Sequence, residues 1–169
     1  RLVLADPTVL QTLPEAEFTS GMAEVIKHGI IGDAQLLENL PGFGILEGLG
    51  KIIRRGMAVK VRVIEEDPYE KGLRAALNYG HTVGHGVELV SGFKVRHGEA
   101  VAIGTLAEAR MAEQIGLAQP GLAEQISALL ETAGLPSHIP PGLDREKIIA
   151  AMQHDKKKAD GIVRFALPA

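Results

Sequence analysis

The sequence contains no cysteine, which excludes a disulfide framework, a CxxC redox pair and a thiolate zinc site. It also lacks a run of about 18 consecutive apolar residues, the length that a membrane span requires. Its first residues show no basic segment followed by a cleavable apolar one, so no secretory signal is recognised. Any metal must therefore be held by histidine and carboxylate side chains, and we expect a cytoplasmic protein.

Positive charge is not in excess, because 18 Lys and Arg stand against 21 Asp and Glu and the net charge is −3. Nucleic acids and anionic membrane surfaces attract proteins with a net positive charge, so neither is an expected partner. With 46% hydrophobic and 23% charged residues, the composition is that of an ordinary globular protein. The 169 residues suffice to bury a sizeable core, and we predict one domain over residues 1–169.

Helical periodicity, interrupted by glycine and proline, covers most of the chain. We predict seven helices, at approximately Glu15–Ile30, Asp33–Leu40, Leu49–Glu66, Leu73–Val90, Gly98–Ile115, Gly121–Ala133 and Asp144–His154. Short strands are predicted at Leu2–Leu4 and Ile162–Leu167, too few to form a sheet. The predicted fold class is all-α, a multi-helix domain of about seven helices with short strand remnants at its two ends. Because the chain opens on Arg1 and directly on a strand, we expect a fragment of a longer protein.

One face of the predicted helix Leu73–Val90 is polar. Its residues are spaced 4, 3, 4 and 3 apart, which places them within an arc of about 80°; they are Arg74, Asn78, His81, His85 and Glu88. A solvated face is the simple explanation. The other faces are apolar or carry glycine, however, so the helix is expected to pack on several sides. That combination favours a polar cleft over a solvated face.

Charged residues on two other helices are less decisive. Lys60 interrupts the inward apolar stripe of Leu49–Glu66, so it must snorkel, pair with an acid or point into a site. Glu24 can share a helix face with Lys27 and His28, for which an ion pair on a wet surface is the ordinary interpretation. The pattern alone leaves these alternatives open.

His97 immediately precedes the helix Gly98–Ile115, which is apolar around most of its circumference and should be central. We therefore expect His97 near the interior. A catalytic divalent metal needs about three protein ligands, and the candidates are Glu24, His28, His81, His85, His97 and Glu99. His81 and His85 have the i, i+4 spacing of an HExxH motif but lack its glutamate. Spacing alone does not select the third ligand.

Three long motifs in order resemble the C-terminal helical domain of 3-dehydroquinate synthase, within the sugar phosphate cyclase superfamily. They are GMAEVIK at 21–27, GLRAALNYGHTVGH at 72–85 and HGEAVAIG at 97–104. The similarity extends from Asp6-Pro7 through EDPYEKGLR at 66–74 to AGLP at 133–136 and DKK at 155–157. Ala16 stands where the family often has arginine, a difference that touches no ligand.

The resemblance implies a role for individual residues. The implied metal ligands are Glu24, His81 and His97, holding Zn²⁺ or Co²⁺. The implied catalytic residues are Lys27, Lys60 and His85, and His85 would either support a metal ligand or handle protons. The implied substrate contacts are Arg74, Asn78, Glu70 in the pocket wall, and one of Lys156 and Lys157. An arginine suits a planar carboxylate, and lysines suit a phosphate.

The activity that the resemblance implies converts the seven-carbon keto-acid phosphate DAHP into 3-dehydroquinate and phosphate, a step of the shikimate pathway. NAD oxidises a substrate hydroxyl and is regenerated within the cycle. The N-terminal NAD-binding domain of such an enzyme is absent from this chain, so no residue here is assigned to NAD, and a homodimer is expected of the intact enzyme. The alternatives are another sugar phosphate cyclase, against which Arg74 favours a substrate with a carboxylate, and a non-catalytic metal-binding helical module.

Overall fold

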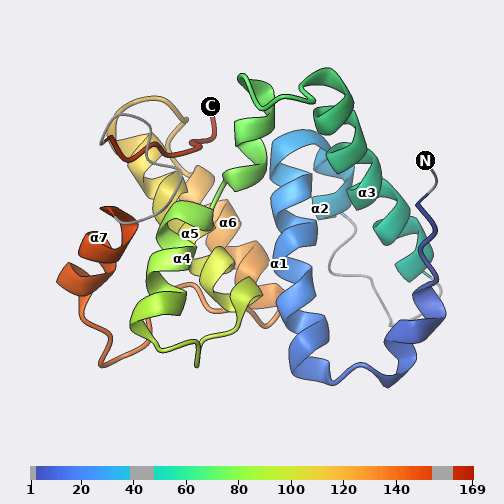
Figure 1. Cartoon of the computed structure of the whole chain (residues 1–169), viewed down its shortest axis with the longest axis horizontal. Helices are drawn as coiled ribbons and strands as arrows, with labels where there is room; N and C mark the ends of the chain where they lie inside the picture. The colour runs from blue at the N-terminus through green and yellow to red at the C-terminus, as the bar shows by residue number, and fades with distance from the viewer. Residues whose placement is uncertain (1–2, 39–47, 154–161) are drawn as a thin grey trace.

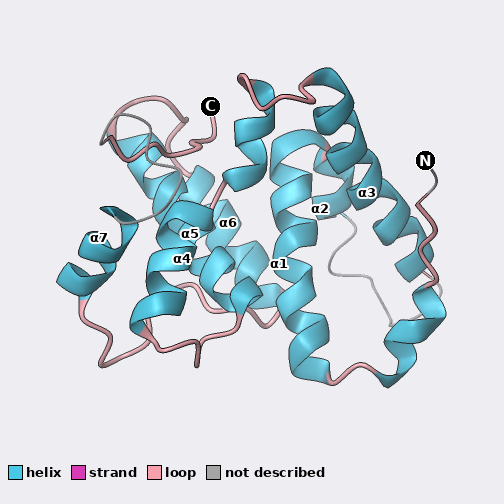
Figure 2. Ribbon diagram, in the orientation of Figure 1, coloured by secondary structure: helices cyan, strands magenta, loops and turns pink. Residues whose placement is uncertain are grey.

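The computed structural model describes residues 3–38, 48–153 and 162–169, and within these residues the fold is helical (Figure 2). Two short 3₁₀ helices and seven α-helices follow one another as η1 (Pro7–Thr12), α1 (Glu15–Gly32), α2 (Ala34–Glu38), α3 (Leu49–Glu66), η3 (Leu73–Asn78), α4 (His81–Val90), α5 (His97–Gln114), α6 (Leu122–Thr132) and α7 (Arg145–Gln153). The predicted all-α class is confirmed, and the helix boundaries agree to within two residues wherever both ends are described, apart from the Leu73–Val90 segment.

α1 lies between two groups of helices (Figure 1). On one side it packs against α2 and α3, and on the other against α5, which in turn packs against α4 and α6. α7 covers the outer side of α4. Residues at the facing sides of α1, α3, α4 and α5 therefore come together although they are up to 80 positions apart in the sequence.

α5 is the central helix, as its apolar sequence predicts, and eleven of its residues are buried. Two hydrophobic clusters meet on it. One joins α5 to α1 and α6 through residues such as Leu106, Ile26 and Ile126, and the other joins it to α4 and α7 through Ile103 and Val87. Burying a large aliphatic side chain contributes about 1.5–3 kcal/mol, so these clusters hold α1 and α4 against opposite sides of one rigid helix.

The predicted single helix Leu73–Val90 is wrong, because the chain breaks into η3 and α4 at Gly80. Gly80 has φ = 78°, a left-handed conformation that ordinary side chains rarely adopt. The backbone N–H of Gly80 donates to the carboxylate of Glu108 on α5 at 2.7 Å instead of continuing the helix. The polar residues of this segment therefore do not share one helix face, but the break turns η3 and α4 toward the same space.

The crossing of α4 over α5 is unusually close because glycines lie on both sides of it. A Cβ atom on Gly104 would overlap the carbonyl oxygen of Gly80, and one on Gly84 would lie 3.1 Å from the carbonyl oxygen of Ala100. Both helices therefore need glycine at the contact. The close approach fixes the first turn of α4, and with it His81, relative to α5.

An ion pair and a hydrogen bond fasten α3 to the end of α1. The Arg55 guanidinium donates to both carboxylate oxygens of Asp33, and to Gln35 Oε1 at 2.9 Å. Two turns further along α3, Arg62 donates to the carbonyl oxygen of Gly32 at 2.9 Å. Two points of attachment prevent α3 from rotating about its axis, so the direction in which Lys60 projects is set.

The predicted terminal strands do not form in the described residues. Val3 and Leu4 are 73% and 87% exposed. Residues 162–169 are irregular apart from an isolated bridge at Ile162. A strand needs a ladder of hydrogen bonds to a neighbour, and neither segment forms such a ladder with the described residues. None of the helices in the described ranges combines the length and hydropathy that crossing a lipid bilayer requires.

Replacing Gly104 by alanine is expected to destabilise the protein by about 3 kcal/mol, because the new methyl group must push α4 away from α5. Gly21→Ala is the matched control, since it also adds a methyl group to a helix but has open space around it. We expect Gly21→Ala to be neutral or to stabilise by up to about 1 kcal/mol. Urea unfolding curves measure both changes, and equal stability of the two variants would contradict the close crossing.

Candidate metal and substrate site

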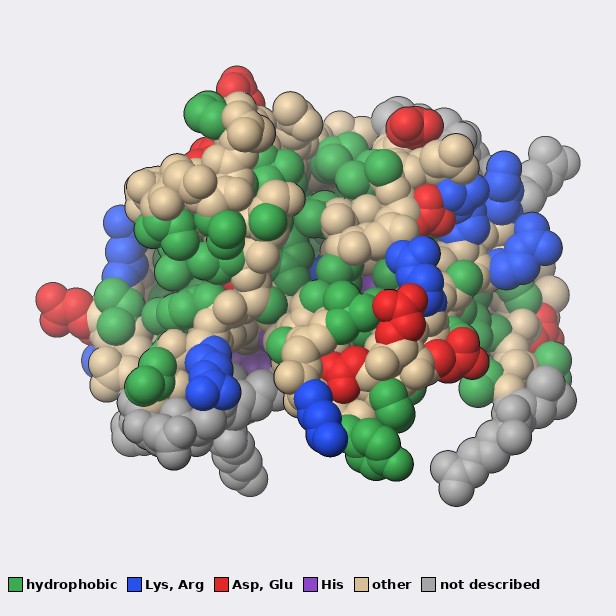
Figure 3. Space-filling view, turned by 90° about the horizontal axis from the view of Figure 1, so that it is seen from above, with side chains coloured by type: hydrophobic (Ala, Val, Ile, Leu, Met, Phe, Trp, Pro, Cys, Tyr) green, Lys and Arg blue, Asp and Glu red, His purple; other side chains and the backbone are tan. Residues whose placement is uncertain are grey.

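A polar cavity of about 470 Å³ opens between α1, α3, η3 and the starts of α4 and α5. Ten residues line it, eight of them charged or histidine: Glu24, Lys27, His28, Lys60, Glu70, Arg74, Leu77, Asn78, His81 and His97. In the space-filling view, histidine surface appears as small recessed areas among other side chains (Figure 3). The polar cleft that the sequence favours over a solvated face therefore exists, built from five helices rather than one.

His81 is the first residue of α4, and its ring is fixed from one side. The Nδ1 atom lies 3.1 Å from the carbonyl oxygen of Tyr79, which only accepts hydrogen bonds, so Nδ1 carries the proton and donates. Burial lowers the pKa of His81 to about 4, and the charge of Lys27 adds to the effect. The imidazole is thus neutral at pH 7 with its Nε2 lone pair available, 3.5 Å from Glu24 Oε1.

Glu24 and Lys27 pair in the cavity wall rather than on a wet surface as their spacing suggests, with Lys27 buried and the Glu24 side chain 33% exposed. Lys27 is 3% exposed; its Nζ lies 2.7 Å from Glu24 Oε2 and donates to the carbonyl oxygen of Leu77 at 3.0 Å. Burial opposes ionisation of Glu24, but the charge and hydrogen bond of Lys27 outweigh it, so the pKa of Glu24 is lowered. A charged carboxylate is thereby held in the cavity wall.

His97 is the first residue of α5, and its side chain is 50% exposed, so the expectation that it lies near the interior is wrong. Gly98 takes the buried position instead, against Ser20 of α1. This contact places His97 at the rim of the cavity, with its ring centroid 5.3 Å from that of His81.

Glu24, His81 and His97 each offer one ligand atom, and these atoms all lie within 4.8 Å of one another. Glu24 Oε1 is buried and accepts no hydrogen bond from the described residues, although buried carboxylate oxygens ordinarily have partners. Two histidines and a carboxylate form an ordinary zinc set, and the orphaned oxygen needs a cation. The residues therefore fit a divalent metal.

A second group, His85, Glu88 and His97, satisfies the same distance criterion and shares His97 with the first. His85 lies on α4 one turn after His81, with ring centroids 5.4 Å apart. The structure thus brings the candidate ligands His81, His85 and His97 to one place, and it adds Glu88, which was not among the candidates. The orphaned oxygen of Glu24 favours the first group as the metal site.

Two cations, Lys60 and Arg74, line the cavity together with Asn78 and Glu70. Lys60 projects from α3 to the cavity surface, while Arg74 and Asn78 reach it from η3. Asn78 donates to Glu70 Oε1 at 3.4 Å. Lys156 and Lys157 lie outside the described residues. The cavity thus presents several cations to a solute, as an anionic substrate requires.

Asp67, which the sequence analysis did not single out, shapes the loop before η3. Its carboxylate accepts the backbone N–H groups of Lys71, Gly72 and Arg74 at 2.8, 2.8 and 3.0 Å. These bonds lower the pKa of Asp67, and they fold the loop so that the backbone of Arg74 is held in place. An aspartate directly after a helix and before proline is the signal that could have revealed this turn.

His28 and Glu99, two further candidate ligands, lie outside both metal groups. His28 lines the cavity, and burial lowers its pKa. Glu99 accepts the backbone N–H of Arg96 at 2.9 Å, so it caps the start of α5. Its carboxylate is occupied in fixing the helix that carries His97.

Residues 21–158 match the family model described as 3-dehydroquinate synthase C-terminal. The chain belongs to this family. It is 48% identical to the 3-dehydroquinate synthase of Nostoc punctiforme and 50% identical to that of Synechocystis sp., over 99% of the chain in both cases. The chain spans about half the length of these curated relatives, 49% of each.

Solved structures of sugar phosphate cyclases share the fold of this 3-dehydroquinate synthase C-terminal domain. ValA, a 2-epi-5-epi-valiolone synthase from Streptomyces hygroscopicus with NAD⁺ and Zn²⁺ bound, matches with a TM-score of 0.83 and 25% identity over 96% of this chain and 47% of its own. A 2-deoxy-scyllo-inosose synthase complexed with carbaglucose-6-phosphate, NAD⁺ and Co²⁺ matches with a TM-score of 0.78 and 28% identity, covering 94% and 45%.

Within this family domain, Glu108 is a buried acid that the sequence analysis missed. It is fully buried on α5, and its carboxylate accepts the backbone N–H groups of Gly80 at 2.7 Å and Val83 at 3.4 Å. It thereby caps α4 immediately before His81. A lone glutamate in an otherwise apolar stretch of helix was the available signal. Burial raises the pKa of Glu108 to about 7 from its ordinary value of 4.5, despite these hydrogen bonds.

The raised pKa of Glu108 predicts a pH dependence of stability. The folded protein binds a proton at Glu108 more tightly than the unfolded chain, so the associated stability is full below pH 4.5 and is lost as the pH rises to about 7. Over this range, wild type should lose about 3 kcal/mol relative to Glu108→Gln, whose amide does not titrate. Urea unfolding of both proteins at several pH values measures the difference, and a difference independent of pH would contradict the shift.

Proposed function

We propose that this chain is the metal- and substrate-binding domain of a 3-dehydroquinate synthase, a phosphate-eliminating lyase that converts DAHP into 3-dehydroquinate. The observation that carries the proposal is the meeting of Glu24, His81 and His97 in a cavity walled by cations. Relatives that cover 99% of the chain at 48% and 50% identity bear the same name. The sugar phosphate cyclases of solved structure are only 25% and 28% identical.

Glu24, His81 and His97 are proposed as ligands of Zn²⁺ or Co²⁺, ions named in the related cyclase structures. A divalent ion held by these residues would polarise a substrate hydroxyl and favour its oxidation by NAD. Lys27 keeps Glu24 ionised and discourages protonation of His81. Both ligands are thus in the ionisation state that a metal requires.

Lys60 and Arg74 are proposed to bind the two anionic ends of DAHP. The planar guanidinium of Arg74 suits the carboxylate, and lysines suit the phosphate. Lys156 and Lys157 stay candidates for the same phosphate, and Asn78 and Glu70 are proposed to contact substrate hydroxyls. His85, beside His81 and His97, is proposed to hold or move a proton of the bound substrate.

The proposal requires a second part of the enzyme. We propose that an N-terminal domain binds NAD and closes the cavity, consistent with relatives about twice as long as this chain. We further propose a cytoplasmic homodimer for the intact enzyme. Neither residues for NAD nor a dimer contact are assigned here.

Metal binding should depend unequally on the three histidines of the site. Replacing His81 or His97 by alanine should abolish tight Zn²⁺ binding, because each removes a ligand from a set of three. Replacing His85, which lies beside both histidine ligands, should weaken binding by about 10 to 100-fold. This is the usual effect of removing a residue that supports a metal ligand. Competition with a chelator measures the three affinities. Loss of the metal in His85→Ala together with its retention in His97→Ala would contradict the assignment of ligands.

The function itself is tested by supplying DAHP, NAD and Zn²⁺ to the intact protein that carries this chain and an NAD-binding domain. We expect release of inorganic phosphate without net consumption of NAD, whereas the 169-residue chain alone should bind Zn²⁺ and release none, because no hydride acceptor is positioned. Turnover of sugar phosphates that lack a carboxylate in place of DAHP would indicate another cyclase. Tight metal binding with no turnover of any of these substrates would indicate a non-catalytic module.

A further inference from the structure

Glu88 lies beside the ring of His97. Both of its carboxylate oxygens are 3.2 Å from His97 Nδ1. A carboxylate at neutral pH only accepts hydrogen bonds, so Nδ1 must carry a proton and donate it toward Glu88. In the neutral tautomer that holds its proton on Nδ1, the lone pair that binds a metal is on Nε2.

We propose that Glu88 is a positioning residue for His97, which holds the ring in the tautomer and orientation that present Nε2 to the metal. The proposal rests on the proposed function, since it takes Glu24, His81 and His97 as the ligands. Carboxylate, histidine and metal in this order form a recurrent arrangement, in which the carboxylate raises the basicity of the imidazole and limits its rotation. Glu88 acts through His97 and is not itself a ligand.

The backbone around Glu88 is held firmly enough for such a role. Its carbonyl oxygen accepts the Ser91 hydroxyl at 2.8 Å and the backbone N–H of Phe93 at 2.9 Å, which close the C-terminal end of α4. The side chain of Glu88 is 15% exposed, so water competes little for its carboxylate. Its position is therefore determined by α4 and the turn that follows.

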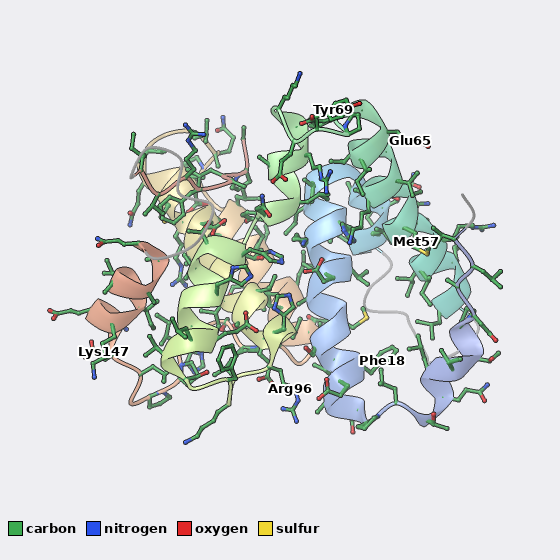
Figure 4. All side chains as sticks on the ribbon, in the orientation of Figure 1. Phe18, Met57, Glu65, Tyr69, Arg96 and Lys147 are labelled. Atoms are coloured by element: carbon green, nitrogen blue, oxygen red, sulfur yellow. The ribbon has the colours of Figure 1, made fainter. Side chains whose placement is uncertain are left out.

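The backbone of His97 is held independently from the opposite side. Gly98 N–H donates to Ser20 Oγ at 3.0 Å, and no Cβ fits between Gly98 and the backbone of Ser20. Arg96 Nε donates to Glu17 Oε1 of α1 at 2.9 Å, at the end of α1 near Phe18 (Figure 4). With its backbone fixed to α1, the ring of His97 retains only side-chain rotation, and the contact with Glu88 restricts that rotation.

The need for a positioning residue is greater at His97 than at His81. The ring of His81 is largely enclosed and has the carbonyl oxygen of Tyr79 as a fixed acceptor. The ring of His97 is half exposed, so without a partner it could turn toward water and exchange the proton between its two nitrogens. Glu88 gives His97 the acceptor that Tyr79 gives His81.

The experiment measures Zn²⁺ affinity of the 169-residue chain by competition with a chelator, for wild type and for Glu88→Ala, Glu88→Gln and Glu24→Ala. We expect Glu88→Ala to weaken binding by about 10 to 100-fold and Glu24→Ala to abolish tight binding. Glu88→Gln should recover most of the affinity, because an amide oxygen still accepts from Nδ1. Glu65→Ala is the matched control, since it removes an exposed carboxylate at the far end of α3 (Figure 4), and it should bind as wild type does.

A second measurement detects the orientation itself in the metal-free chain. Imidazole ¹⁵N–¹H correlation spectra at about pH 8 should show His97 protonated on Nδ1 in wild type and in Glu88→Gln, and a mixture of tautomers in Glu88→Ala. A merely structural role of Glu88 would move the unfolding temperature but not this signature. We expect the unfolding temperatures of Glu88→Ala and Glu88→Gln to stay close to that of wild type.

The outcomes separate this inference from the proposed function. Unchanged affinity and tautomer in Glu88→Ala, with Glu24→Ala unable to bind, would overturn the role of Glu88 and leave the metal site intact. Loss of the metal in Glu88→Ala together with its retention in Glu24→Ala would place the ion among His85, Glu88 and His97, which overturns both. If wild type does not bind Zn²⁺, the proposed metal site fails, while the tautomer of His97 still decides the role of Glu88.

Discussion

The close crossing of α4 and α5 is the constraint on which the site depends. α4 begins with His81 and α5 begins with His97, so the two imidazoles can only meet if the helices cross near their starts. Glycines at positions 80, 84 and 104 permit that approach. Glu108, buried in α5, accepts the free N–H groups at the start of α4 and prevents that helix from sliding along its neighbour. The crossing of α4 and α5 therefore determines the packing of the two helices, the capping of α4 and the positions of both histidines.

Electrostatics then gives the cavity its chemical character. Lys27 is almost fully buried, and its ammonium group is balanced by Glu24 and by the carbonyl oxygen of Leu77. This buried cation keeps the Glu24 carboxylate charged and disfavours a second positive charge on His81. Lys60 and Arg74 add further positive charge near the mouth. A metal-binding carboxylate and imidazole thereby coexist with a surface that attracts an anionic solute.

Local sequence patterns predicted the helices well where packing is one-sided. Leu49–Glu66 agrees residue for residue with α3, because its apolar stripe faces α1 and its other face is solvated. The break at Gly80 escaped prediction because the polar stripe from Arg74 to Glu88 is compatible with one continuous helix. The interruption is imposed by Glu108, 28 residues later in the chain, and such a long-range contact leaves no periodic signal.

Periodicity also indicated a polar cleft but could not predict which helices form it. The histidines of α4 were recognisable as cleft residues, whereas their meeting with Glu24 of α1 depends on how α1 and α4 pack against α5. Only the resemblance to a family named this set of three ligands, and their role as ligands stays a prediction. The same limit applied to Lys27, whose spacing from Glu24 is that of an ordinary surface pair, because burial is a property of the whole fold.

The most direct test of the account is the position of the metal in a crystal of the Zn²⁺-loaded chain, located by anomalous scattering at the zinc absorption edge. The account predicts one strong peak at about 2.0–2.2 Å from a carboxylate oxygen of Glu24 and from Nε2 of both His81 and His97. A peak coordinated by His85, Glu88 and His97 instead, or the absence of any peak at the cavity, would contradict it.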